Sequence, residues 1–414
     1  MRVSPLAGFV SKYEGNMSFL RLVAVAVMTT VLFPIASVQA ETLHEALESA
    51  WNRQPAQRAE TARLGELEAK RQATTNLTPL PSSISLGQRT DQIGSNVGQR
   101  QTDIEFSAPL WLPGQRDSQR ALVEAETSRF SATQTFTKWR LAGEVRYLWW
   151  ATRLAQSEKD LANQRVSSAQ KLLSDVERRV KAGDLARVDA NRVNVELQTA
   201  NIALKDAEAQ AFRAMQQFTA LTGLTAIPQE TESVNLQPSE NHPQKLAAQS
   251  LVLAQKRLDL IRSTPRDAPE LSLGLTHQKD ISNDPYNNSV SLKFKIPFAS
   301  DAINQQRLAA VQAEQAEADA EQGLESARIE AEIASANFEL EQAKATAAIA
   351  ELRFNTALDT QQLLDRSFNL GESDLPTRLL AEATRFEAER NLIKARLETG
   401  RAISKANQAL GVLP

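Results

Sequence analysis

The residue types that commonly carry catalysis or bind metals are few and scattered in this sequence. The three histidines, His44, His242 and His277, lie far apart, and none has a second histidine or a carboxylate at ligand spacing on an identifiable common face. The chain contains no cysteine, which excludes disulfides, thiol nucleophiles, thiolate metal sites and a lipid-modified cysteine. It also has no glycine-rich phosphate loop and no basic patch of the kind that binds nucleic acid. We therefore expect no enzyme, no metal site and no cofactor.

Charged side chains instead alternate with apolar ones in two short segments, residues 82–110 and 270–297. A period of two is typical of a β-strand with one apolar and one polar face. Each segment predicts two strands of about ten residues around a polar turn, the length of a tilted transmembrane strand. The apolar positions of one face include Ile104, Phe106, Leu292, Phe294 and Ile296. The charged positions of the opposite face are Asp103, Glu105, Lys293 and Lys295.

Four strands cannot form a closed barrel within one chain. Bacterial outer-membrane barrels have at least about eight strands, and an open sheet edge in lipid leaves amide groups unpaired. We therefore expect several copies to share one barrel, with the apolar positions facing lipid and the charged positions facing the lumen. Two copies would give about eight strands and a filled interior, whereas three would give about twelve and room for a pore. The alternative is that both hairpins pack on a soluble helical domain.

Two long helical segments must position these strands. Residues 112–181 and 299–370 contain few helix breakers, and each would span about 105 Å as a single helix. In the second segment, apolar and small residues alternate spacings of four and three, which predicts left-handed winding against neighbouring helices. These seam positions are Ile329, Ile333, Ala336, Leu340, Ala343, Ala347, Ala350 and Phe354. A helix of this length must be part of a larger wall, because it cannot fold back on a small core.

The chain repeats its own order at a fixed offset of 188 residues. The landmarks that keep this offset are Pro55 and Pro243, Pro81 and Pro269, Phe106 and Phe294, Pro109 and Pro297, and Gly183 and Gly371. We interpret them as a duplicated unit of helix, β-hairpin, long helix, turn and shorter helix, in a mainly α fold with a small β portion. The first repeat is predicted at 41–224, with its β-hairpin at 82–110 and its helical hairpin at 112–222. An inter-repeat loop at 225–242 leads to the second repeat at 243–414, with hairpins at 270–297 and 299–410.

The first 40 residues differ from the rest in composition. Phe19 to Val38 is almost entirely apolar and ends in a small-residue exit at Ala40, the pattern of a secretory signal peptide. The start codon is Met1 or Met17, and an N-terminal membrane anchor is the alternative interpretation of this segment. After Ala40 no apolar run reaches the length of a transmembrane helix. The sequence therefore predicts an exported chain that does not cross a bilayer by helices.

The duplicated order and several short motifs resemble the TolC-type outer-membrane efflux family. These motifs are the helix entry FSAPLWLPGQR and the turns VKAGDLARVDANR and FNLGESDLPTRLLAEA. The segments TLHEALESAWNRQP and PLWLPGQR are similar to its heavy-metal efflux branch, the CzcC and CusC kind. The resemblance covers nearly all of residues 41–414.

This resemblance implies a homotrimer with a 12-stranded β-barrel in the outer membrane and a long periplasmic α-helical barrel. It also implies docking to a periplasmic adaptor, or membrane fusion, protein and an inner-membrane pump of the resistance-nodulation-division type. The missing cysteine departs from lipid-anchored members, so no acyl anchor is expected. The function implied is a passive exit duct, and heavy-metal cations are one candidate cargo. A soluble periplasmic coiled-coil scaffold is the alternative.

In the family, the turn of each long helical hairpin is the periplasmic tip that meets the adaptor. The matching residues here are Gly183, Asp184, Leu185, Gly371, Asp374 and Leu375. Glycines at such reversals are expected to adopt a positive φ as helix-terminating residues. Carboxylates near the turns would face one another around a trimer axis and form an acidic, cation-selective gate, or they would simply cap helix N-termini. These carboxylates are Asp184, Asp189, Glu372 and Asp374.

Overall fold

The computed structural model describes residues 42–235, 243–298 and 301–414. The predicted signal peptide at 1–40 lies outside the described residues, as do His242 and the last seven residues of the predicted inter-repeat loop. Within the described part of the chain, no helix is both long enough and apolar enough to cross a membrane.

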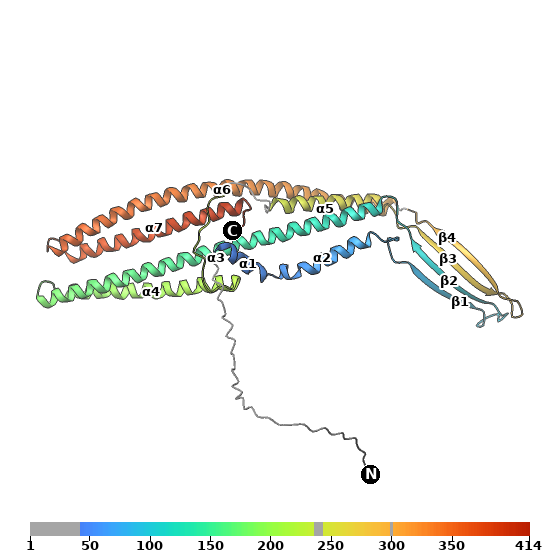
Figure 1. Cartoon of the computed structure of the whole chain (residues 1–414), viewed down its shortest axis with the longest axis horizontal. Coiled ribbons are helices and arrows are strands. Elements are labelled where there is room, and N and C mark those ends of the chain that lie inside the picture. The colour runs from blue at the N-terminus through green and yellow to red at the C-terminus, as the bar shows by residue number, and fades with distance from the viewer. Residues whose placement is uncertain (1–41, 236–242, 299–300) are drawn as a thin grey trace, which may run out of the picture. The chain divides into compact units, whose positions relative to one another are not determined.

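The described residues of the first half of the chain form four helices and two strands (Figure 1). The Thr42 hydroxyl caps the first helix by accepting a hydrogen bond from the Glu45 amide at 3.2 Å, the first half of a capping box. Pro55 starts the second helix at a position where its missing N–H costs no hydrogen bond. The elements are α1 (Leu43–Asn52), α2 (Pro55–Ala73), β1 (Ser83–Thr90), β2 (Arg100–Pro109), α3 (Gln115–Ala182) and α4 (Arg187–Thr222).

The second half follows the same order, except that α1 has no counterpart among the described residues. The two long helices, α3 and α6, are 68 and 69 residues long, so each spans about 100 Å. The elements are α5 (Gln244–Ser263), β3 (Glu270–Lys279), β4 (Asn287–Lys295), α6 (Asp301–Asn369) and α7 (Leu375–Ala409).

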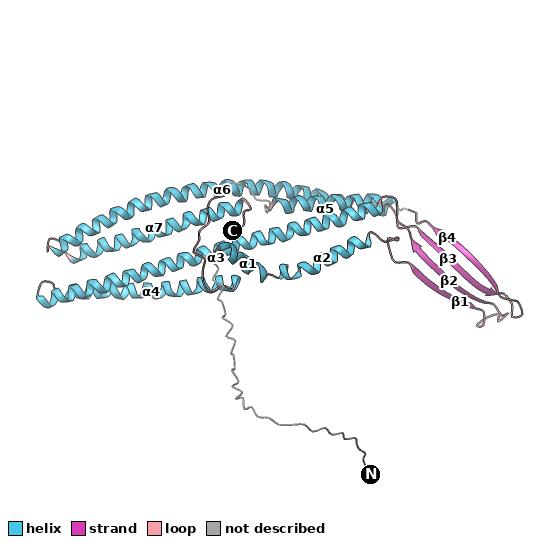
Figure 2. Ribbon diagram, in the orientation of Figure 1, coloured by secondary structure: helices cyan, strands magenta, loops and turns pink. Residues whose placement is uncertain are grey.

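The helices pack in two long antiparallel hairpins, α3 with α4 and α6 with α7 (Figures 1 and 2). The predicted seam of α6 is confirmed, because Ala336 and Leu340 are buried against Ala402 and Ala406 of α7. The small side chains allow the two backbones to approach closely. Contacts of α3 with α7 and of α5 with both long helices join the two halves.

The largest core cluster lies where α1 meets α3 and the residues after α4. The Trp149 and Phe218 side chains are fully buried there, together with Leu47 of α1. The neighbouring Trp150 lies against Gly400 of α7, where any added Cβ would overlap the indole ring. Close contact between a large and a small residue thus fixes α3 on α7.

The four strands form one antiparallel sheet in the order β1-β2-β3-β4. Directly paired residues of an antiparallel sheet share one face, so the register aligns apolar residues in rows across all four strands. One such row is Ile84, Phe106, Leu273 and Leu292. β1 and β4 are the two edges, and each has a partner on one side alone within the described chain.

Candidate functional site

One face of the sheet is apolar and exposed. Four of the five apolar positions predicted from the sequence, Ile104, Phe106, Leu292 and Phe294, lie on it with solvent-exposed side chains. The fifth, Ile296, is also exposed but lies one residue beyond the end of β4. Ile84 and Leu86 of β1 and three leucines of β3 are exposed on the same face. A sheet face covered by large apolar side chains is unusual on a protein in water and marks a contact with another apolar phase or surface.

The opposite face carries the predicted charges, and most of them are paired. The Lys293 ammonium donates to the Glu105 carboxylate at 2.7 Å, and these two residues occupy equivalent positions of the two repeats. Lys295 lies 3.6 Å from Glu270. Asp103 instead accepts hydrogen bonds from Gln101 and from the Thr276 hydroxyl at 2.6 Å. The alternation predicted from sequence is therefore present, with charges of opposite sign neutralising one another.

The two β-turns are tied together at one end of the sheet. The Asp91 carboxylate accepts hydrogen bonds from the Val97 and Gly98 amides at 2.6 and 3.1 Å. The Ser282 amide donates to the Val97 carbonyl at 3.0 Å, so the β1–β2 and β3–β4 turns are in direct contact. Gly98 has a φ of +105°, and an added Cβ there would overlap the Ser282 backbone.

Each long helix ends at a glycine with a left-handed backbone. Gly183 has a φ of +88° and Gly371 a φ of +79°, which confirms the expected helix-terminating conformation. The Asp184 amide donates to the Arg179 carbonyl, and the Glu372 amide donates to the Ser367 carbonyl, both at 2.9 Å. Each turn thus satisfies the last carbonyls of its helix while both glycines stay exposed, with open space around them.

The ends of the two helical hairpins are joined within one chain. The Arg179 guanidinium of α3 donates to the Asn369 side chain at 2.7 Å. Arg179 and Arg378 also lie over the Phe368 ring, at 5.0 and 5.2 Å from its centroid, in cation–π geometry. Leu375 is only 2% exposed and packs in this small core, so its side chain is not available to a docking partner here.

The four carboxylates near the tips differ in their surroundings. Asp374 caps α7 by accepting from the Thr377 amide at 3.1 Å, and hydrogen bonds from Thr377 lower the pKa of this carboxyl. Asp189 lies 3.5 Å from Arg192 in the first turn of α4. Asp184 and Glu372 are exposed at the turns. The capping interpretation therefore holds for Asp374.

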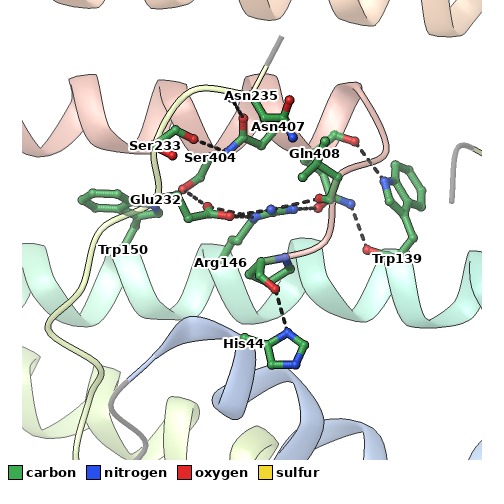
Figure 3. Close-up of polar contacts among 12 residues, drawn as sticks. His44, Trp139, Arg146, Trp150, Glu232, Ser233, Asn235, Ser404, Asn407 and Gln408 are labelled. Carbon is green, nitrogen blue, oxygen red and sulfur yellow. Dashed lines mark hydrogen bonds and ion pairs between the residues drawn. The ribbon is translucent and has the colours of Figure 1, made fainter. Parts of the chain in front are cut away.

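A buried polar network crosses from α3 to α7 and to the residues that follow α4 (Figure 3). Arg146 of α3 is only 3% exposed, and its guanidinium donates twice to the Glu232 carboxylate, at 2.6 and 3.0 Å. The same guanidinium donates to the Val412 carbonyl at 3.0 Å and to the Gln408 side chain. The Ser404 hydroxyl of α7 donates to Glu232 Oε2, which also accepts from Arg146 Nε, so this carboxylate is held from two helices.

Two further α7 side chains hold neighbouring backbone in the same network. Asn407 accepts from the Asn235 amide and donates to the Ser233 carbonyl, each at 2.9 Å, which clamps the loop after α4 onto α7. Gln408 exchanges two hydrogen bonds of 2.9 Å with Trp139 of α3 (Figure 3). Sequence reasoning missed this network; its one signal was an arginine within the apolar stretch LAGEVRYLWW.

Within residues 42–235, 243–298 and 301–414, no group of three or more histidine, cysteine, aspartate or glutamate residues is placed to hold a metal ion. His44 bonds to the Pro414 carbonyl at 2.9 Å, and His277 stacks on Tyr286 with a 4.2 Å centroid separation. His44 and His277 thus each make a contact within the fold, a hydrogen bond and a ring stack respectively.

Solved structures of membrane proteins share this fold. The outer membrane protein VceC of Vibrio cholerae matches with a TM-score of 0.72 and 13% identity, over 89% of this chain and 96% of VceC. CusC, described in terms of transmembrane channel formation, also gives 0.72, with 15% identity over 89% of this chain and 92% of CusC. The chain has the fold of the TolC-type outer-membrane channels. This fold confirms the resemblance expected from the sequence motifs and the duplicated order.

In sequence, part of the chain is similar to a metal-resistance protein. The cobalt-zinc-cadmium resistance protein CzcC of Cupriavidus metallidurans is 27% identical over 194 residues. That match covers 44% of this chain and 46% of CzcC, so it spans about half of the curated relative. No protein-family model matches the chain.

Proposed function

We propose that this protein is the outer-membrane exit duct of a tripartite efflux system. The observation that carries the proposal is the four-stranded sheet, which combines an exposed apolar face with two edges that no described residue of the chain pairs. In lipid, an unpaired strand edge costs several kcal/mol for each exposed amide, so such a sheet needs neighbours on both sides. Pairing β1 of one copy with β4 of the next closes the sheet without any other chain.

Three copies fit this closure best. Three sheets give a barrel of about twelve strands, wide enough for a water-filled lumen, whereas two give about eight and a filled interior. In the trimer the five predicted apolar positions face lipid, and Asp103, Glu105, Lys293 and Lys295 face the lumen. The paired charges of the lumen face leave it without a strong preference for one sign of ion.

The helices offer matching surfaces for the same assembly. Val188, Val195 and Ile202 form an exposed apolar stripe along α4 at a spacing of seven residues. An apolar groove of about 600 Å³ runs between α6 and α7 and is lined by Leu352 and Leu380. We infer that the α4 stripe of one copy packs into the α6–α7 groove of the next and extends the barrel as a helical wall into the periplasm.

The hairpin tips are the proposed docking surface for a periplasmic adaptor. Gly183, Asp184 and Gly371 are exposed there with no covering residue, and Leu185 is half-buried beside them. Asp374 is exposed on the same surface, and the buried Leu375 supports it from beneath. In a trimer, Asp184, Asp189, Glu372 and Asp374 would lie around the axis as an acidic gate.

Energy for export must then come from an inner-membrane pump, for which a resistance-nodulation-division type is proposed. The similarity to the cobalt-zinc-cadmium resistance protein CzcC supports heavy-metal cations as the class of exported substrate. The duct itself is passive, and no catalytic role is assigned to it.

Fractionation of the expressing cells tests this proposal. Membranes are washed with alkaline carbonate and separated on a density gradient into inner and outer fractions. We expect the protein in the outer-membrane fraction, released only by detergent. Recovery in the soluble periplasmic fraction, with its sheet still folded, would contradict the proposal and favour the periplasmic scaffold.

A further inference from the structure

Large apolar side chains continue beyond the strands at the end of the sheet where the helices attach. Leu77, in the segment between α2 and β1, is 91% exposed, and Leu80 of the same segment is also exposed. Phe298, three residues after β4, is 93% exposed. These three side chains are called the collar below. Neither the pairing of the strands nor the packing of the helices explains why these three large apolar side chains are exposed.

The segment that carries Leu77 and Leu80 is held firmly in place. The Arg116 guanidinium of α3 donates to the Thr74 and Thr75 carbonyls at 2.8 and 2.6 Å. The Trp111 indole N–H donates to the Asn76 carbonyl at 3.1 Å. Three side-chain hydrogen bonds to consecutive backbone carbonyls anchor this segment on the start of α3. The exposed leucines are therefore presented on a fixed scaffold.

The collar continues the apolar face of the sheet. Leu292 and Phe294 of β4 lie on that face, and Ile296 and Phe298 follow beyond the end of the strand at the same interval of two residues, both with exposed side chains. On the opposite edge, Leu80 lies three residues before β1, whose Ile84 is on the apolar face. Pairing β1 with β4 of a neighbouring copy would bring Leu80 of one copy beside Phe298 of the next, and the collar would then be continuous.

We propose that the collar inserts into the hydrocarbon of the periplasmic leaflet and sets the depth of the protein in the membrane. This inference rests on the proposed function, since it needs the sheet to stand in a bilayer. Acyl chains are the occupant because the collar is continuous with the face assigned to lipid. The Trp111 indole beside it has the amphipathic character typical of side chains at a membrane interface.

The absence of cysteine in the sequence allows a direct measurement of depth. Single variants Leu77→Cys, Phe298→Cys and Phe294→Cys are labelled with a polarity-sensitive fluorophore and reconstituted into phosphatidylcholine vesicles. The vesicles contain lipids brominated either near the headgroup or deep in the acyl chain. Leu64→Cys is the matched control, because Leu64 is also an exposed leucine but lies within α2.

We expect labels at positions 77 and 298 to be quenched several-fold more strongly than the label at position 64, and more by the shallow bromine than by the deep one. The label at position 294 should be quenched by deep bromine. The collar proposal would be wrong if the labels at 77 and 298 were quenched no more than the label at 64, or if their emission reported an apolar environment without quenching by brominated lipid. If the label at 294 were still quenched in that case, the proposed function would stand. Loss of quenching at 294 would instead reject the proposed function.

Discussion

Arg146 and Glu232 form a two-pronged ion pair in the interior, although 86 residues separate them in the chain. Arg146 comes from the middle of α3, and Glu232 comes from the loop that leaves α4. Gln408 and Ser404 of α7 complete the hydrogen bonding, so one buried pair connects the first helical hairpin to the second. The stability of the helical part should therefore depend on this pair.

Arg146→Leu should strongly destabilise the protein. Removing one partner leaves a buried carboxylate unpaired, which typically costs about 3–5 kcal/mol. The measurement is thermal unfolding of the detergent-solubilised protein followed by helical circular dichroism. The matched control is Arg353→Leu, which breaks a 3.1 Å pair with Glu387 whose side chains are more than half exposed. That change should cost at most about 1 kcal/mol. Equal melting temperatures for the two variants would show that the buried pair carries no special weight.

Phe294→Arg and Lys293→Arg test the two faces of the sheet at adjacent positions. Arginine at Phe294 would face hydrocarbon close to the helix-proximal end of β4, and should destabilise the protein by at most the roughly 2–4 kcal/mol that applies at the bilayer midplane. Arginine at Lys293 keeps the pair with Glu105 and should be nearly silent. Yields in the outer-membrane fraction measure the difference. Similar yields for both variants would contradict the assignment of the two faces.

Glu382 on α7 should make the packing of the helical hairpins depend on pH. It lines a small cavity together with Arg165 of α3 and Glu196 of α4. Burial raises the pKa of its carboxyl above 4.5; Asp365 and Glu196 raise it further, while Arg378 and Arg385 oppose the shift. Below its ordinary pKa the group is neutral in both the folded and unfolded states. As pH rises above that value, the unfolded chain ionises first, so the free energy of unfolding decreases until the raised pKa is passed.

Glu382→Gln should remove this part of the pH dependence. The variant keeps a similar shape without a charge, so its unfolding temperature should exceed that of the parent at about pH 8 and approach it near pH 4.5. Unfolding temperatures of both proteins across this range provide the measurement. Parallel curves for parent and variant would mean that Glu382 does not titrate within the packed hairpins.

Gly183→Trp and Gly371→Trp test the docking role of the tips. An L-residue in the left-handed conformation costs about 1–2 kcal/mol, but open space surrounds both glycines. Assembly should therefore survive, while an adaptor that approaches closely would be blocked. Export by the complete system should fall in each variant and further in the double variant, at unchanged amounts of protein in the outer membrane. Full export by the double variant would place adaptor docking elsewhere.

Periodic patterns account for what the sequence could predict. The seam at Ala336 and Leu340 and the alternation around Phe294 repeat over many residues, so they identify helix contacts and sheet faces without a structure. Gly183 and Gly371 were predictable because a reversal between long helices needs a left-handed residue.

Contacts between distant segments lay beyond such patterns. Arg146 meets Glu232, Gln408 and Ser404 only because the loop after α4 folds over α3 and onto α7, and that loop has no periodicity. The burial of Leu375 depends in the same way on Phe368 and Val193, which come from other helices. The pairing of Glu105 with Lys293 required the strand register, which sequence alone left open.

The central claim is that several copies complete one barrel, because the described residues of each chain supply four strands with two open edges. Native mass spectrometry of the protein extracted from the outer membrane in mild detergent tests it most directly. A single species with three times the mass of the processed chain is predicted, and its strand signal in circular dichroism should disappear together with the trimer. A monomer that retains a folded sheet, or a stable dimer, would contradict the account.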